Sequence, residues 1–252
     1  MKKTIAIIGV EGILGPAIVH GFARVGYRTL VAHYDEEGLA DLGGKIPLLV
    51  SKIRLQEPHA DIEVASSARE ASWEADIVIP TVPYNLQAAV ASRIKDVVTG
   101  KIVISAINPI NETLDGLLTP PTTSAAEELA RLLPHSKVVK AFNTIFPADL
   151  DTPEFIGQAV DVFVAGDDEE AVSAVTQLVR DLGLLPLFVG GLAMSRTLEN
   201  MMVLLISLSL RNQFLKPVGW KVVHDTEAHT ELDGLEASII KTERNLLCGK
   251  DG

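Results

Sequence analysis

The sequence predicts an α/β protein built on a doubly wound, mostly parallel sheet with a helical C-terminal part. Strand-like and helix-like segments alternate over the first half of the chain. The strand-like segments are apolar at nearly every position, which is typical of strands covered on both faces. A glycine-rich turn also joins the first strand to the first helix, so the crossover to the next strand is helical.

The glycine-rich turn is the first pointer to function. Residues 4–8 are an apolar strand, Gly9, Gly12 and Gly15 follow, and residues 16–25 have helical spacing. Gly9 permits a tight turn, Gly12 lets a diphosphate approach the backbone, and Gly15 lets the helix pack on the strand. The free N–H groups at the helix start favour an anion. The pattern predicts a dinucleotide site of the Rossmann type. Because the spacing is G-x-x-G-x-x-G rather than G-x-G-x-x-G, a turn that binds nothing is the alternative. The candidate contacts are Gly9, Glu11, Gly12, Ile13 and Leu14.

Each later strand is an apolar run bounded by polar or turn residues. The expected strands are residues 27–33, 61–65, 76–83, 101–106, 137–142 and 160–165, with a short extended segment at 185–189. Their Ile, Val and Ala residues suit strands that are buried on both faces. Helical spacing between them predicts helices at 35–56, with an interruption near Gly43, Gly44 and Pro47, at 84–98, and from Asp168 to Leu182.

Residues 108–123 break this alternation. They are rich in Asn, Pro, Gly and Thr and show no periodicity. We expect a long loop after strand 101–106, at the sheet edge where ligands bind in such folds. A solvated surface connection is the alternative. Ser124 and Glu127 then have the spacing of a capping box that begins a helix.

The chain is expected to have three parts. Residues 1–148 form the dinucleotide-binding domain, residues 149–223 a smaller part, and residues 224–252 a polar tail. The smaller part contains one long, strongly apolar helix at 193–215. Such a helix is buried in its own monomer or shared with a second subunit.

Composition excludes several classes of function. The net charge of the 252 residues is −11, which argues against nucleic acid and anionic membranes as partners. No apolar run reaches the ~18 residues that a membrane span needs. Cys248 is the single cysteine, so we expect neither a disulfide framework nor a cysteine metal site. We expect a cytoplasmic location.

Several separate segments resemble one family in its order. They are residues 7–15, 81–84, 107–109, 124–127, 137–145, 166–168, 195–199 and 219–221, which together extend over about residues 3–222. The chain resembles the NADP-dependent reductases of coenzyme F420, an 8-hydroxy-5-deazaflavin that carries hydride. The tail has no counterpart in that family.

The resemblance implies an oxidoreductase with an NADP-binding domain, a small-molecule hydride acceptor and a homodimer. Hydride would pass directly between nicotinamide and the deazaflavin in a cleft. The protein would supply proximity, orientation and exclusion of water. No catalytic side chain and no metal are therefore expected. His224 and His229 lie near acidic residues, but their polar setting makes a metal site an unfavoured alternative.

The chain departs from this family at the positions after the second strand that would bind the 2′-phosphate of NADP. The family tends to place Ser-Arg after the second strand, and the matching positions here are His33 and Tyr34. Asp35 lies about where a carboxylate binds ribose hydroxyls in NAD sites. Helix capping is the alternative role for Asp35. The local residues therefore favour NAD, whereas the resemblance favours NADP, and Glu11 adds a carboxylate near the diphosphate.

Residues at successive strand ends are expected to border the two rings. The candidates are Val82, Pro83, Tyr84, Asn108, Pro109 and Asn143. Ordinary turn chemistry is the alternative for the prolines and asparagines. Arg196 is expected either to meet an acidic group of a ligand or to pair with Glu199 one turn along its helix.

Two other functions are open from the sequence. An imine, carbonyl or ferric ion is an alternative hydride acceptor, and the first two need a proton donor. The candidate donors are Tyr84, His135, Lys140 and Lys221. A non-catalytic nucleotide sensor whose acidic tail binds a protein is the third possibility.

Overall fold

The computed structural model describes residues 2–10, 12–34, 45–151, 153–155, 157–214 and 218–223. The chain divides into two compact units, Met1–Trp220 and Lys221–Gly252. All described helices and strands lie in the first unit. The boundary expected near residue 149 stays a prediction, and strands from both sides of it share one sheet.

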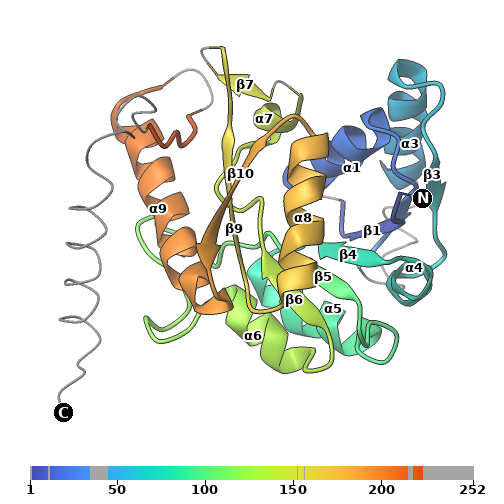
Figure 1. The fold of residues 1–252 in the computed structure, drawn as a ribbon, viewed down its shortest axis with the longest axis horizontal. Coiled ribbons are helices and arrows are strands. Elements are labelled where there is room, and N and C mark those ends of the chain that lie inside the picture. Colours follow the sequence, from blue (N-terminus) through green and yellow to red (C-terminus); the bar gives the residue numbers. More distant parts are fainter. Residues whose placement is uncertain are drawn as a thin grey trace, which may run out of the picture. The chain divides into compact units, whose positions relative to one another are not determined.

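One eight-stranded sheet organises the first unit, in the order β10-β9-β6-β5-β4-β1-β2-β3 (Figure 1). The strands are β1 (Ile5–Ile8), β2 (Thr29–Ala32), β3 (Ile62–Val64), β4 (Ile77–Pro80), β5 (Ile102–Ser105), β6 (Lys137–Lys140), β9 (Asp161–Gly166) and β10 (Leu185–Gly190). β6 and β9 pair antiparallel, and the other neighbours pair parallel. The doubly wound, mostly parallel sheet is therefore confirmed.

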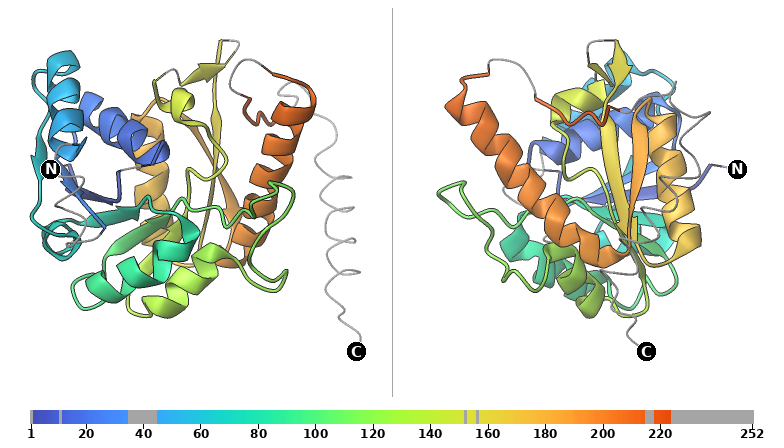
Figure 2. Two further views of the ribbon diagram at one scale, coloured as in Figure 1. Left: turned by 180° about the vertical axis from the view of Figure 1, so that it is seen from behind. Right: turned by 60° about the vertical axis from the view of Figure 1, so that its left-hand side comes forward.

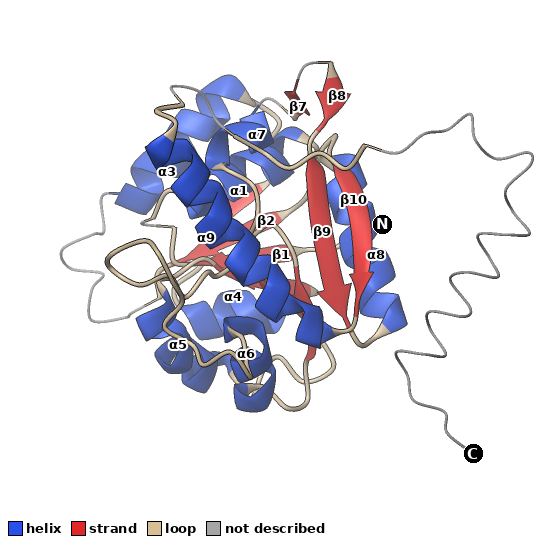
Figure 3. Ribbon diagram, turned by 90° about the vertical axis from the view of Figure 1, so that its left-hand side faces the viewer, coloured by secondary structure: helices blue, strands red, loops and turns tan. Residues whose placement is uncertain are grey.

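Helices cover both faces of this sheet (Figures 2 and 3). One face packs on α1 (Leu14–Arg24), α3 (Lys45–Gln56) and α8 (Glu169–Asp181). The other face packs on α4 (Ala68–Glu74), α5 (Gln87–Ile94) and α6 (Ala125–Leu132). Alternate residues of β1 feed the two cores, Ile5 and Ile7 on one side and Ala6 and Ile8 on the other. This double burial explains why the strand has no polar position.

The last long helix, α9 (Ser195–Arg211), lies across β9 and β10 from α8 (Figure 2). Phe163 and Ala165 of β9 form a small core with Leu198 of α9, while Val162 and Val164 join the core on the α8 side. The helix is shorter than the predicted 193–215. None of the helices in the described part of the chain is long and apolar enough to cross a membrane.

Some elements differ from the sequence predictions. The segment predicted as helix 84–98 begins as the 3₁₀ turn Tyr84–Leu86 and continues as α5. Pro47 does not interrupt α3, because it lies in the first turn, where a missing N–H is no loss. Gly43 and Gly44 lie outside the described residues. α4 and the small elements α7 (Pro147–Asp151), β7 (Glu154–Phe155), β8 (Gln158–Ala159) and Leu192–Met194 were not anticipated.

Candidate functional site

The glycine-rich turn is tied to the strands on both sides of β1. Gly9 has φ +83°, a conformation that favours glycine. Its N–H donates to the Ala32 carbonyl at the end of β2, with an N–O distance of 2.9 Å. The Thr81 hydroxyl, just beyond β4, donates to the Gly9 carbonyl at 2.6 Å. Contacts within the protein thus hold the turn in place without a ligand.

Gly15 sets the distance between α1 and the turn. A Cβ at this position would lie 2.8 Å from both Thr81 Oγ1 and Val10 Cα, and the second of these is backbone that cannot swing away. The predicted role of Gly15 in close helix packing is therefore confirmed.

We expect Gly15→Ala to destabilise the fold by about 1–3 kcal/mol, because the added methyl overpacks the turn. Without such a clash, a Gly→Ala change inside a helix would stabilise the protein by about 0.5–1 kcal/mol. The sign of the change in the free energy of unfolding therefore tests the clash. Thermal unfolding should show a lower midpoint than wild type. An unchanged or higher midpoint would contradict the predicted steric clash.

Gly12, in contrast, faces open space. The nearest heavy atom to a Cβ built there is the Thr81 carbonyl oxygen at 3.9 Å. The first turn of α1 carries no acidic residue, and its N-cap residue Ile13 has no side-chain hydrogen bond to the helix. The first-turn backbone N–H groups and the positive end of the helix therefore lie beside this space, which fits a diphosphate.

A cavity of about 270 Å³ opens beside this turn. It is lined by Gly12, Ile13, Leu14, Thr81, Val82, Pro83, Tyr84, Ala106, Ile107 and Asn108. The turn, the end of β4 and the end of β5 thus meet in one place. Seven of the sequence candidates line it, and Thr81, Ala106 and Ile107 were missed. The signal for these three was available, because they directly follow the apolar runs of β4 and β5.

The remaining candidates lie around this cavity rather than in its lining. His33 and Tyr34 follow β2, with ring centroids 5.1 Å apart, and the Arg93 guanidinium donates to the Tyr34 carbonyl. Gly9 lies at the base of the turn, and Pro109 is buried beyond Asn108. Glu11, Asp35, His224 and His229 lie outside the described residues. The described residues contain no group of three His, Cys, Asp or Glu side chains suited to a metal.

Tyr84 is held by a carboxylate. Its hydroxyl donates to Glu128 Oε2 at 2.6 Å. Burial and this hydrogen bond raise the pKa of Tyr84 to about 12. A phenol with so high a pKa stays protonated at physiological pH and is a poor proton donor to a substrate.

Asn108 and Asn143 hold each other's amides. Asn143 Nδ2 donates to Asn108 Oδ1 at 2.9 Å, and Asn108 Nδ2 donates to the Asn143 carbonyl at 2.8 Å. Asn143 is 1% exposed and follows Phe142, which has φ +63°. A positive φ is costly for a bulky residue, so the packing around the β6 end must enforce it.

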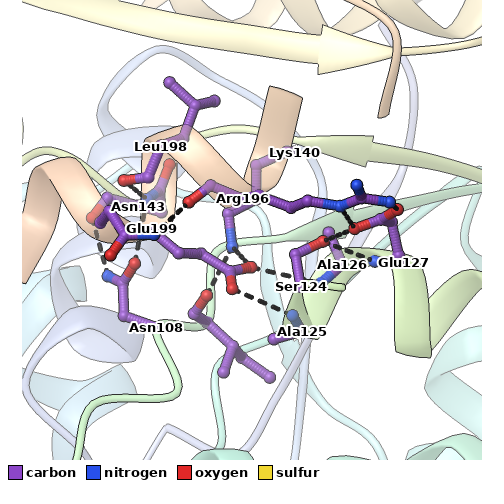
Figure 4. Close-up of polar contacts among 12 residues, drawn as sticks. Asn108, Ser124, Ala125, Ala126, Glu127, Lys140, Asn143, Arg196, Leu198 and Glu199 are labelled. Carbon is purple, nitrogen blue, oxygen red and sulfur yellow. Dashed lines mark hydrogen bonds and ion pairs between the residues drawn. The ribbon is translucent and has the colours of Figure 1, made fainter. Parts of the chain in front are cut away.

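The predicted helix start at Ser124 is confirmed. Ser124 Oγ accepts from the Glu127 N–H at 3.1 Å and donates to Glu127 Oε2 at 2.7 Å. Arg196 donates to Glu127 from Nε at 2.8 Å and again from Nη2 (Figure 4). This pair lowers the pKa of Glu127. The alternative in which Arg196 pairs with Glu199 is therefore wrong, since Arg196 reaches across to α6.

Lys140 and Glu199 are both fully buried, and they pair with each other. Lys140 Nζ lies 2.7 Å from Glu199 Oε1, and both side chains are 0% exposed. Burial lowers the pKa of Lys140, and the Glu199 carboxylate opposes that shift. Lys140 does not line the cavity, so it is wrong as a proton donor there. Sequence reasoning missed the pair, although Glu199 shares a helical stripe with Leu198, Met202 and Leu205.

The chain is similar to known proteins in sequence and in fold. A family model described as "NADP oxidoreductase coenzyme F420-dependent" matches residues 4–109. The F420-dependent NADP reductase of Methanocaldococcus jannaschii is 34% identical over 215 residues, which are 82% of this chain and 92% of that protein. The enzyme of the same name from Methanothermobacter thermautotrophicus is 30% identical over 222 residues, 84% of this chain and 92% of that protein. A crystal structure from Arthrobacter sp. FB24 superimposes with a TM-score of 0.75 at 23% identity, covering 87% of this chain and 99% of that one.

Proposed function

The chain belongs to the family of F420-dependent NADP reductases, and we propose that it transfers hydride between NADP and coenzyme F420 in the cavity beside the glycine-rich turn. The observation that carries this proposal is the meeting of Gly12, Val82 and Asn108 around one space of about 270 Å³. These residues follow the ends of three neighbouring strands, β1, β4 and β5, at the sheet edge where dinucleotides bind.

The chain's own residues have simple tasks in this proposal. When bound, NADP and F420 supply the two rings between which the hydride moves. The N–H groups at the start of α1 bind the diphosphate, and Val82 and Ile107 exclude water from the rings. Asn108 presents an amide that Asn143 holds in one orientation. No side chain needs to give or take a proton in the transfer itself.

Deuterium transfer tests this function. The purified protein is given F420 and NADPH carrying deuterium on the transferred position of nicotinamide C4. Because position 5 of a 5-deazaflavin is carbon, the reduced F420 should retain the deuterium in ordinary water. NADPH consumption without deuterium in the product, or no consumption at all, would refute the proposal.

NADPH is expected to bind more tightly than NADH, by about tenfold or less. The family is named for NADP, but His33 and Tyr34 stand where a bidentate arginine would hold the 2′-phosphate. Side-by-side calorimetry at one salt concentration measures the ratio. An equal or tighter Kd for NADH would show that Asp35 and its acidic neighbours set an NAD preference instead.

Tyr84→Phe separates this function from carbonyl or imine reduction. Since the Tyr84 hydroxyl is bound to Glu128 and has a pKa of about 12, its loss should change kcat with F420 by less than about twofold. The pH profile below pH 9 should also match that of wild type, because Tyr84 does not titrate there. A drop of about a hundredfold would assign Tyr84 as the proton donor of a different reaction.

A homodimer and a cytoplasmic location complete the proposal. α9 exposes Leu204 and Leu208, which lie one turn apart on the same face, and this supports a partner subunit on that helix. The single Cys248 suits a reducing compartment. Light scattering of the purified chain measures the oligomeric state.

A further inference from the structure

A buried polar network joins α9 to the edge of the proposed hydride-transfer cavity (Figure 4). Its centre is the ion pair of Lys140 on β6 and Glu199 on α9, and neither side chain is exposed. A buried ion pair is weak evidence for stability, because well-packed apolar residues often serve as well. The role of this pair is therefore better inferred from the groups that it contacts.

Glu199 is fixed by donors from two elements. Besides Lys140, the backbone N–H of Ala125 donates to Oε2 at 3.0 Å and that of Ala126 donates to Oε1 at 3.3 Å. Both N–H groups belong to the first turn of α6, where the helix dipole favours a carboxylate. The carboxylate therefore stays in one place and holds the Lys140 ammonium there.

Lys140 connects the fixed Glu199 carboxylate to the cavity wall. Its Nζ donates to the Ile107 carbonyl oxygen at 2.6 Å, just beyond the end of β5. Ile107 and the next residue, Asn108, both line the cavity. The lysine therefore joins Glu199 of helix α9 to this wall.

A second connection runs in parallel. Asn143 Nδ2 donates to the Leu198 carbonyl of α9 at 2.9 Å as well as to Asn108 Oδ1. Both partners are acceptors, so the orientation of the Asn143 amide follows from its contacts. Asn108 is thus held from its backbone side by Lys140 and from its side chain by Asn143.

We propose that Lys140, held by Glu199, is a positioning residue for hydride transfer, because its contact with the Ile107 carbonyl fixes the cavity wall at Asn108. The inference rests on the proposed function. A direct transfer between two rings depends steeply on their separation and alignment, so a wall displaced by about 1 Å lowers the rate by up to about a hundredfold. Lys140 touches neither ring in this arrangement.

The test compares two variants that both lack the Glu199 carboxylate. In Glu199→Gln, Lys140 keeps its N–H donors and still donates to the Ile107 carbonyl. In Lys140→Met/Glu199→Gln, that contact is lost while a neutral acceptor remains for the α6 amides. We expect kcat of the double variant to be about tenfold below that of Glu199→Gln. The KM for NADPH should be unchanged and the isotope effect with deuterated NADPH larger. Equal kcat values would overturn the proposal.

Arg196→Met is the matched control, because the Arg196–Glu127 pair joins the same two helices without reaching the cavity. Its kcat should stay within about twofold of wild type. If the double variant does not fold, Lys140→Leu/Glu199→Gln, which also lacks a donor at position 140, takes its place in the same comparison. A fall in kcat as large in Arg196→Met would assign the effect to general loosening of α9 and overturn the proposal.

Hydrogen–deuterium exchange gives a readout that needs no turnover. Backbone amides in the segment 106–117 should exchange faster in the double variant than in Glu199→Gln or Arg196→Met. Unchanged exchange in that segment would refute the positioning role. A wild-type protein that binds NADPH but reduces no F420 would refute the proposed function alone, because the exchange comparison still decides whether Lys140 fixes this wall.

Discussion

Gly12→Val is expected to lower NADPH affinity by at least about a hundredfold while the fold persists. A Cβ at Gly12 has its nearest contact at 3.9 Å, with the Thr81 carbonyl oxygen, so we expect the fold to accept a side chain at this position. Its methyl groups project into the space beside the first turn of α1, where the backbone must approach the diphosphate. A hundredfold loss corresponds to about 2.7 kcal/mol of binding free energy.

Calorimetric titration with NADPH measures this loss, and thermal unfolding checks the fold. Gly15→Ala is the matched control, because its Cβ would clash with Val10 and Thr81. The two variants should differ in their main effect: Gly12→Val should lower NADPH affinity more than the unfolding midpoint, and Gly15→Ala should lower the unfolding midpoint more than NADPH affinity. A Kd of Gly12→Val for NADPH within about threefold of the wild-type value would show that the glycine-rich turn does not bind the dinucleotide.

Lys140→Met alone is expected to destabilise the protein by about 3–5 kcal/mol, because it leaves the Glu199 carboxylate buried without its ion-pair partner. In a chain of this size, that loss lowers the midpoint of thermal unfolding by roughly 10 °C. Adding Glu199→Gln removes the buried charge and should restore much of the stability.

Urea unfolding of the single and double variants measures both effects. A single variant within about 1 kcal/mol of wild type would mean that water reaches Glu199 or that the carboxylate takes up a proton at little cost. Failure of Glu199→Gln to restore stability would show that packing of the lysine stem, rather than charge, dominates at this position.

Much of the fold was predictable because its strands are buried on both faces. β1 and β4 are apolar at every position and β5 at all but its last, Ser105, and the structure buries every residue of the three. The alternation with helices then implies parallel pairing by right-handed crossovers. The antiparallel pairing of β9 with β6 was not predictable, since a strand that reverses direction has the same composition as one that does not.

The cavity was predictable where it follows the ends of strands. Val82, Pro83, Tyr84 and Asn108 come directly after β4 and β5, and parallel strands bring their carboxyl ends together. Contacts that depend on distant packing were not predictable. Lys140 and Glu199 are 59 residues apart, and the partner of Arg196 lies 69 residues away on α6. Local spacing suggested Arg196 and Glu199 as partners because they share one helix.

A crystal structure with NADP and F420 bound tests the central claim most directly. The account predicts the NADP diphosphate against the backbone N–H groups of residues 12–15 and the nicotinamide beside Val82 and Asn108. The deazaflavin ring should face the nicotinamide from the open side of the same cavity. Diphosphate density elsewhere on the chain, or two rings bound too far apart for hydride transfer, would contradict it.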